Sequence, residues 1–389
     1  MFYELAVDTW NDEEKAAIAD VVASGRFTMG PRTTAFEQAC AKSIGRKYAV
    51  MVNSGSSANL VGVASLFFRK SNPLQRGDEA IVPAISWSTT YSPLQQYGMK
   101  LRFVDVELDT LNMDVSKLEA ALTPRTRLIM GVSILGNPAA LDVMRAFADK
   151  HGLVFFEDNC ESLGAELNGR PAGTFGDIGT FSTFFSHHIS TGEGGIMTTD
   201  DPEIDALARA IRAHGWTRDV PGDVGVYKPW DDAFKEAYRF ILPGYNLRPQ
   251  ELNAAVGLVQ LKKVDAMTAA RRRNMDLFNK LFAGDERFII QRENGKSSSF
   301  SFTIILNPKS SIDRDRVFAA LRAADIGFRM ITGGCYPRHE AIVHFDYELV
   351  GEMTNADIAH DYGFFIGNHP FDLSEQIRRA HDVLDRACN

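Results

Sequence analysis

The sequence predicts an α/β protein in which a mostly parallel sheet forms a large domain over residues 1–250, followed by a smaller α+β domain over residues 251–389. Three observations predict this. A chain of 389 residues is too long for one compact core. In its first two thirds, short apolar runs alternate with helical patterns, as in βαβ units. After residue 250 a long helical region, one clear strand and an amphipathic helix follow instead.

Five segments of the large domain predict strands, because they are rich in β-branched and aromatic residues. They span residues 79–86, 101–106, 127–135, 153–159 and 178–185. Their nearly continuous apolarity predicts burial on both faces, as in a parallel sheet covered by helices. Between two of them, residues 141–152 predict a helix that Asp142 caps and Gly152 ends.

Residues 221–249 are rich in glycine, proline, aromatic and charged residues and predict a long loop. Such a loop is often functional, although a simple surface excursion is the alternative. Beyond it, residues 252–267 begin a long helix and residues 298–306 predict a strand. The last helix, residues 372–387, has Ile377, Ala380, Val383 and Leu384 on one face.

Composition excludes several classes of protein. With 42 basic and 50 acidic residues the net charge is -8, which argues against nucleic-acid binding. The N-terminus has no signal pattern, and the apolar run 60–68 is too short to span a bilayer. The four cysteines are widely separated, which predicts no metal site. We therefore expect a cytoplasmic protein without membrane contact.

Two features predict an anionic ligand in the large domain. Gly55 and Ser56 belong to a hydroxyl-rich turn directly before a helix, and free N–H groups at a helix start favour anions. An ordinary helix cap is the alternative. Asp158 ends a predicted buried strand, where α/β proteins bind ligands, unless it only caps a helix. Trp87 ends another strand, where it could stack on a ring or pack in the core.

The chain resembles the sugar aminotransferase family of fold-type I pyridoxal phosphate enzymes over nearly its whole length. The motifs that carry the resemblance occur in the family's order: GRFTMGPRTTAFEQACAKSIGRKYAVMVNSGSSANL, EDNCESLGA, FFSHHISTGEGGIMTTDD, RAHGWTRD and GYNLRPQELNAAVGLVQL. The resemblance implies an aspartate aminotransferase-like fold. It also implies a homodimer with shared active sites.

The resemblance also implies roles for individual residues. Gly55, Ser56 and Ser182 match phosphate-binding positions, and Asn246 matches a residue that reaches the phosphate of the neighbouring subunit. Asp158 matches the carboxylate that pairs with the pyridine nitrogen, which makes the ring an electron sink. Trp87 matches the aromatic residue stacked on the ring. Glu161 stands where many members have glutamine, and we expect it to bond to the cofactor's phenolic oxygen.

The family's lysine is missing. It lies five positions before the first glycine of GEGG, which here is His187. Adjacent residues of an extended segment point to opposite sides, so His187 is predicted to face the cofactor and His188 the supporting side. Lysine both attaches the cofactor as an imine and moves protons, whereas imidazole can only move protons. The cofactor is therefore expected as non-covalent pyridoxamine phosphate.

This substitution resembles the sugar 3-dehydratases that act on GDP-4-keto-6-deoxymannose, which share SHHI, GWTR and the acidic residue of EDNCES. The resemblance implies that pyridoxamine phosphate condenses with the C4 ketone of a GDP-sugar. It further implies that His187 moves a proton while the C3 hydroxyl leaves, that ammonia is released, and that L-glutamate restores pyridoxamine phosphate from pyridoxal phosphate.

Three further residues are candidates for substrate binding. His214 lies in the RAHGWTR motif, and Arg218 and Arg329 could bind the diphosphate through their guanidinium groups. A structural or solvated surface role is the alternative for each. Cys335 stands where the GDP-sugar dehydratases have asparagine, which leaves the identity of the sugar and base open.

Three other activities stay open at this stage. One is an ordinary nucleotide-sugar 4-aminotransferase, which would leave nitrogen on the sugar. Another is a CDP-sugar dehydrase that works with an iron–sulfur reductase, although such enzymes carry clustered cysteines that this chain lacks. The third is a non-catalytic relative that only binds a nucleotide sugar.

Overall fold

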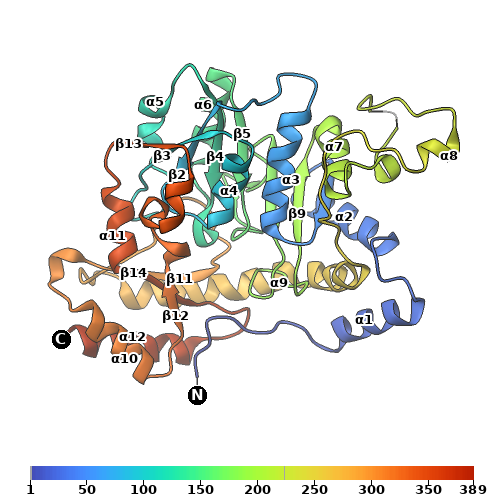
Figure 1. The fold of residues 1–389 in the computed structure, drawn as a ribbon. Coiled ribbons are helices and arrows are strands. Elements are labelled where there is room, and N and C mark those ends of the chain that lie inside the picture. The colour runs from blue at the N-terminus through green and yellow to red at the C-terminus, as the bar shows by residue number, and fades with distance from the viewer. Residues whose placement is uncertain (1, 223) are drawn as a thin grey trace.

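A sheet of eight strands organises the large part of the molecule (Figure 1). The computed structural model describes residues 2–222 and 224–389. The strand order is β1-β9-β8-β5-β4-β2-β3-β13. Within the described residues, β9 runs antiparallel to its two neighbours and the other pairs are parallel. The strands are Tyr48–Val52 (β1), Glu79–Pro83 (β2), Lys100–Val104 (β3), Thr126–Val132 (β4), Val154–Asp158 (β5), Ile178–Ser182 (β8), Gly195–Thr199 (β9) and Tyr347–Val350 (β13).

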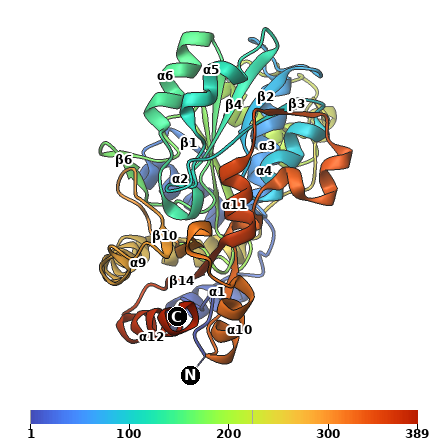
Figure 2. The same ribbon diagram turned by 90° about the vertical axis from the view of Figure 1, so that its left-hand side faces the viewer.

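Helices cover both faces of this sheet, and Figure 2 shows the sheet between the two helical layers. Adjacent residues of β5 show why: Phe156 packs with α3, α4 and α7, and Phe155 packs with α6 on the opposite face. The α/β fold class predicted from apolar strands is confirmed. The covering helices are Pro31–Ile44 (α2), Gly55–Phe68 (α3), Ser88–Gln96 (α4), Leu118–Ala121 (α5), Leu141–His151 (α6) and Pro202–Arg212 (α7).

A second, antiparallel sheet follows in the order β10-β11-β14-β12. The long helix Glu251–Phe282 (α9) runs between the two sheets in Figure 1, and its Phe278 and Phe282 share a core with the second sheet. This sheet and its helices comprise Phe288–Ile290 (β10), Ser301–Leu306 (β11), Arg314–Ala323 (α10), Phe328–Met330 (β12), Thr354–Tyr362 (α11), Gly363–Gly367 (β14) and Ser374–Cys388 (α12). The remaining elements are Asp12–Ser24 (α1), Glu166–Leu167 (β6), Arg170–Pro171 (β7) and Ala233–Glu236 (α8).

Contacts cross the predicted domain boundary at residue 250 in both directions. β13, from the C-terminal part, pairs in parallel with β3 at the edge of the large sheet. Near the other end of the chain, the Tyr3 N–H donates to the Asp325 carbonyl at 2.8 Å. The division into residues 1–250 and 251–389 stays a prediction.

Several predicted elements have different limits. The strand expected over 178–185 ends at Ser182, and the His187 N–H closes a turn with the Phe184 carbonyl at 2.9 Å. Asp142 does not cap α6, because Ala140 occupies the N-cap position. The strands β1 and β9 were not expected. No helix within the described ranges is long and apolar enough to cross a membrane.

Candidate active site

A cavity of about 340 Å³ lies where α3 and α4 begin and where β5 and β8 end. Carboxyl ends of parallel strands are where α/β sheets commonly bind ligands. Phe300, Arg329, Thr332 and Phe365 line the cavity from the C-terminal part of the chain. The cavity brings together eight of the predicted site residues: Gly55, Ser56, Trp87, Asp158, Glu161, Ser182, His187 and Arg329.

The start of α3 forms one end of the cavity. Ser54 is its N-cap, and its hydroxyl accepts a hydrogen bond from the Ser57 N–H at 3.1 Å. The helix begins at Gly55, so the residues expected in a turn before the helix form its first turn. The approach to β8 is close, because a Cβ on Gly55 would lie 2.7 Å from the Ser182 Cβ. The N–H groups of Gly55 and Ser56 therefore lie at the positive end of a helix, and the Ser56 and Ser182 side chains line the same cavity. This arrangement suits an anionic group.

Asp158 is held as a hydrogen-bond acceptor at the end of β5. It is 5% exposed, and its Oδ2 accepts from Asn59 Nδ2 at 2.8 Å and Thr90 Oγ1 at 2.7 Å. Its Oδ1 accepts from the Cys160 N–H at 3.1 Å. A carboxylate offers about four acceptor positions, so one remains for a donor in the cavity.

Asn59 and Thr90 hold Asp158 by hydrogen bonds, and sequence reasoning missed both. Asn59 lies one turn after Gly55 on α3, and its Oδ1 accepts from Thr180 Oγ1 at 2.6 Å. Thr90 lies in the first turn of α4, three residues after Trp87, and its hydroxyl pairs with Ser86 Oγ at 2.7 Å. Helical spacing of three or four residues from predicted site residues is the signal that could have identified both.

Glu161 connects the two parts of the chain beside the cavity. Its Oε2 accepts from the Leu135 N–H at 2.9 Å, and both carboxyl oxygens lie 3.4 Å from Thr332 Oγ1. Burial raises the pKa of Glu161 to about 7, and the negative charge of Asp158 adds to the shift. This carboxyl therefore titrates near neutral pH.

The two histidines occupy different environments. His187 lines the cavity, and its Nδ1 is a buried atom with no hydrogen-bond partner. Burial, and secondly the charge of Arg271, lowers the pKa of His187 to about 4. His188 is 2% exposed, and its Nε2 lies 3.1 Å from the Ser298 carbonyl. His187 is thus a neutral imidazole at the cavity wall, and His188 belongs to the packed layer behind it.

Trp87 and Arg329 extend to the open side of the cavity. Trp87 is 59% exposed, so its ring is not committed to the core and is free to stack on a ligand. Arg329 is exposed on β12 opposite Phe365. Cys335, in contrast, is buried and does not line the cavity. Its side chain therefore does not distinguish ligands by direct contact there.

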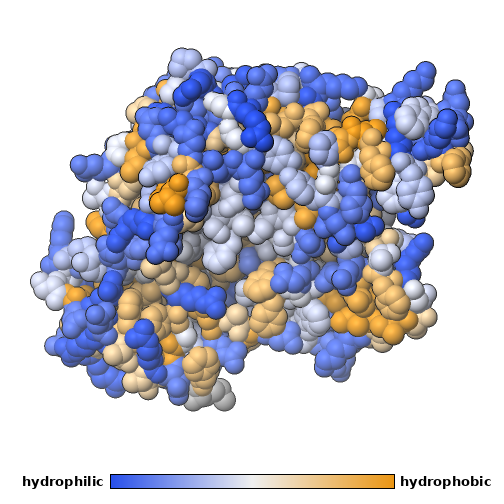
Figure 3. Space-filling model, viewed as in Figure 1, coloured by the Kyte–Doolittle hydropathy of each residue, from blue (hydrophilic) through white to orange (hydrophobic). Residues whose placement is uncertain are grey.

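Three predicted site residues lie outside the cavity of their own chain. His214, Arg218 and Asn246 are exposed and belong to the segment between α7 and α9. This segment, which includes α8, projects from the body at the right of Figure 1. Trp230, Phe234, Tyr238 and Phe240 are exposed on it, and Figure 3 shows an orange hydrophobic group at the end of the projection. The predicted loop 221–249 includes residue 223, which is outside the described residues.

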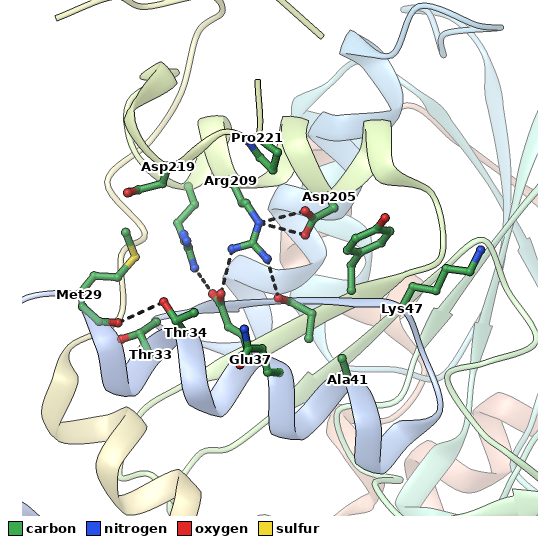
Figure 4. A pocket seen from close by; sticks show the side chains of 15 residues that line it. Met29, Thr33, Thr34, Glu37, Ala41, Lys47, Asp205, Arg209, Asp219 and Pro221 are labelled. Carbon is green, nitrogen blue, oxygen red and sulfur yellow. Dashed lines mark hydrogen bonds and ion pairs between the residues drawn. The ribbon is translucent and has the colours of Figure 1, made fainter. Parts of the chain in front are cut away.

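A separate pocket of about 540 Å³ lies between α2 and α7. Figure 4 shows Arg209 placed between Glu37 and Asp205 there. Arg209 Nη1 donates to Glu37 Oε2 at 2.8 Å, and Arg209 Nε donates to Asp205 at 3.0 Å. Arg212 Nη1 donates to Glu37 Oε1 at 2.5 Å. The charged groups pair with one another, so this cluster joins the two helices.

The 340 Å³ cavity fits the cofactor that the motifs imply. The start of α3 suits its phosphate, Asp158 has an acceptor position for its ring nitrogen, and His187 Nδ1 is a buried atom in need of a partner. No lysine lies among the described residues that line the cavity, so nothing there would attach an aldehyde as an imine. The group would be held non-covalently by these residues.

The chain belongs to the DegT/DnrJ/EryC1/StrS aminotransferase family, whose model matches residues 8–381. It is 45% identical to the GDP-4-keto-6-deoxy-D-mannose 3-dehydratase of Yersinia pseudotuberculosis, over 99% of this chain and 98% of that protein. A solved GDP-4-keto-6-deoxymannose-3-dehydratase, a histidine-to-asparagine mutant with bound GDP-perosamine, superposes with a TM-score of 0.96 at 44% identity. Another structure of this enzyme, with a trapped PLP-glutamate geminal diamine, has the same score and identity. Both matches cover 98% of this chain and 100% of the solved chain.

Proposed function

We propose that this protein is a pyridoxamine phosphate-dependent nucleotide-sugar 3-dehydratase acting on GDP-4-keto-6-deoxymannose. The products are GDP-4-keto-3,6-dideoxymannose and ammonia, while L-glutamate becomes 2-oxoglutarate as it restores the amine. The balance closes, because the oxygen lost from C3 of the sugar equals the oxygen gained when glutamate becomes 2-oxoglutarate and ammonia. Similarity to the GDP-4-keto-6-deoxymannose dehydratases over nearly the whole chain supports the choice of sugar.

One observation carries the proposal: a histidine takes the place of the family's lysine in an otherwise complete cofactor cavity. His187 lines the same cavity as Gly55 and Asp158. Imidazole can transfer protons but cannot displace a sugar from the cofactor as an amine would. Loss of the C3 hydroxyl is then the available outcome, which favours a lyase over a transaminase.

The residues of the cavity divide the work among them. Gly55, Ser56 and Ser182 would hold the phosphate. Asp158 would hold a proton on the ring nitrogen, Trp87 would cover the ring, and Glu161 would bond to the phenolic oxygen. When bound, pyridoxamine phosphate supplies an amine that can condense with a ketone and a ring that stabilises negative charge on the adjacent carbon.

His187 would move the proton in this reaction. A neutral imidazole accepts a proton, so His187 is suited to take one from the C4′ carbon of the cofactor. The imidazolium so formed can donate the same proton to the departing C3 hydroxyl. Proton removal and loss of water would then need a single side chain.

We propose that the site is shared by two subunits of a homodimer. Asn246 is exposed and does not line the cavity of its own chain. The exposed aromatic residues on the same projecting segment are suited to contact a second copy. Asn246 would then serve the phosphate site of the partner, and His214 and Arg218 remain candidates for contact with the GDP-sugar.

The proposal is tested by nitrogen balance. The protein is incubated with GDP-4-keto-6-deoxymannose, L-glutamate and cofactor, and ammonia and the mass of the sugar are measured. We expect one ammonia for each glutamate consumed and a sugar lighter by one oxygen. A sugar that retains nitrogen would instead identify a 4-aminotransferase. Absence of cofactor binding and of glutamate turnover would identify a non-catalytic relative.

A further inference from the structure

A buried arginine without an acidic partner lies behind the candidate site. Arg271, on α9, is 4% exposed. Its Nη1 donates to two backbone carbonyls, those of Phe300 at 3.3 Å and of Asn368, and its Nε has no partner. In the described part of the chain no carboxylate forms an ion pair with it. A buried charge is costly unless it is paired, so an unpaired one needs a reason.

The hydrogen bonds of Arg271 fix the segment that packs against both histidines. Arg271 bonds to the Phe300 carbonyl, and the Phe300 ring lies 5.3 Å from the His187 ring and 5.5 Å from the His188 ring, between centroids. Asn368 Nδ2 donates to the carbonyls of Arg271 and Ser299 at 2.9 and 2.8 Å. Arg271 therefore holds the Phe300 segment, which packs against the His187 imidazole, to α9.

We propose that Arg271 is a positioning residue for His187: it binds the Phe300 carbonyl and so holds the Phe300 ring against the imidazole, and its buried positive charge disfavours a second positive charge on that imidazole. The inference rests on the proposed function only in that His187 is taken to accept a proton during the reaction. A nearby cation disfavours a second positive charge, and burial acts in the same direction. Arg271 thus acts on His187 without touching the ligand.

Charged and titratable groups surround His187 on all sides. His188 is adjacent in the chain and Arg271 acts on it through its charge. The charged or titratable groups that line the same cavity are Asp158, Cys160, Glu161, Glu193 and Arg329. Of these, Arg271 is the charge that lowers the pKa of His187, after burial itself. The neighbouring Arg272 donates to the Ser297 and Gly164 carbonyls instead. Arg272 is therefore a matched control of equal charge.

The charge is tested by titrating His187 in the full-length protein without substrate. Histidine labelled with ¹³C at Cε1 gives one NMR signal per ring, and the His187 signal is assigned by its loss in His187→Asn. We expect a wild-type midpoint near pH 4. Arg271→Gln keeps donors but removes the charge and should raise the midpoint by about one unit. Arg271→Lys, which keeps the charge, and Arg272→Gln should leave it in place.

The packing role is tested separately with Phe300→Leu, which removes the ring but leaves the carbonyl that Arg271 binds. We expect kcat for ammonia release to fall about ten- to hundredfold while the titration midpoint stays low. Two results would overturn the proposal: a His187 titration midpoint at or above pH 6.5 in the wild type, or equal midpoints in wild type and Arg271→Gln. The first of these is measured on the wild type and does not depend on the folding of a variant. Failure of ammonia release in the wild type would overturn the proposed function and leave the titration intact.

Discussion

His187 shows how the surroundings of a residue decide its chemistry. An exposed imidazole would be partly protonated near pH 6.5. Here burial and Arg271 lower its pKa to about 4, so the ring stays neutral throughout the physiological range. The Phe184 and Phe300 rings flank it at 5.9 and 5.3 Å between centroids. A neutral ring in a fixed position can act as a base as soon as ligand is bound.

Replacing His187 tests its role directly. We expect His187→Asn to lower kcat for ammonia release by about 10²–10⁴-fold, because the proton would have no acceptor, while cofactor binding persists. Ammonia release and cofactor absorbance are measured on the same preparation. His344→Asn, at an exposed position outside the cavity, is the control. Equal activity of the two variants would exclude His187 as the base.

Glu161 predicts a pH-dependent spectrum. Burial raises the pKa of this carboxyl to about 7, so it is mostly protonated at pH 6 and mostly ionised at pH 8. If it bonds to the cofactor's phenolic oxygen, the absorbance of the bound cofactor should change across that interval. The change should be absent in Glu161→Gln, which cannot titrate. A spectrum that responds to pH equally in both proteins would show that Glu161 does not contact the cofactor.

At the residue scale, the sequence predicts the motif residues but not the groups that support them. Gly55, Asp158 and His187 stand at positions that a motif register identifies. Arg271 does not, because its contribution depends on a tertiary contact with Phe300. Hydrogen bonds between residues far apart in the chain leave no pattern in a single sequence.

At the scale of elements, an ion cluster fastens α2 to α7. Glu37 is buried on α2, and its carboxyl is bonded to Arg209 and Arg212 of α7 and to the Met51 N–H of β1. Burial alone would raise the pKa of Glu37, but the two arginines outweigh burial and lower it. One carboxylate thus connects two helices and the edge strand.

Removing that carboxylate should destabilise the protein. Glu37→Ala leaves two guanidinium groups without their buried partner, which costs about 3–5 kcal/mol in the free energy of unfolding. The midpoint of urea unfolding measures the loss, and Gln38→Ala, exposed on the same helix, is the control. Because the pKa of Glu37 is lowered in the folded state, Glu37 stabilises the fold fully at pH values above its pKa in the unfolded chain. This stabilisation is lost as the pH falls through the lowered pKa of the folded state. A Glu37→Ala midpoint equal to the control would contradict this role.

Strands buried on both faces are the elements that the sequence predicts best. Five apolar segments of the large domain match β2, β3, β4, β5 and β8, although each predicted segment continues beyond the observed carboxyl end of its strand. Their ends differ because hydrogen bonds, not hydrophobicity, decide where a strand stops. After Ser182 the Thr183 and Phe185 N–H groups still donate to the Gly194 and Gly192 carbonyls, and the chain turns only where the His187 N–H donates to the Phe184 carbonyl. β1 and β13 join the sheet through partners distant in sequence.

At the scale of the whole molecule, a mixed dimer distinguishes shared from separate sites. His187→Asn and Asn246→Ala are each expected to be inactive alone. If each site combines His187 of one chain with Asn246 of the other, a heterodimer has one site in which both residues are intact. Mixing the two variants after partial unfolding and refolding should therefore restore ammonia release. No recovery despite heterodimer formation would show that His187 and Asn246 of one chain serve the same site.

The pairing of β13 with β3 has a consequence for how the protein is made. Residues 100–104 emerge from the ribosome long before residues 347–350, so the backbone edge of β3 stays uncovered while the residues between them are made. An uncovered strand edge is a template for association with other chains. The growing polypeptide is consequently exposed to aggregation from the synthesis of β3 until that of β13.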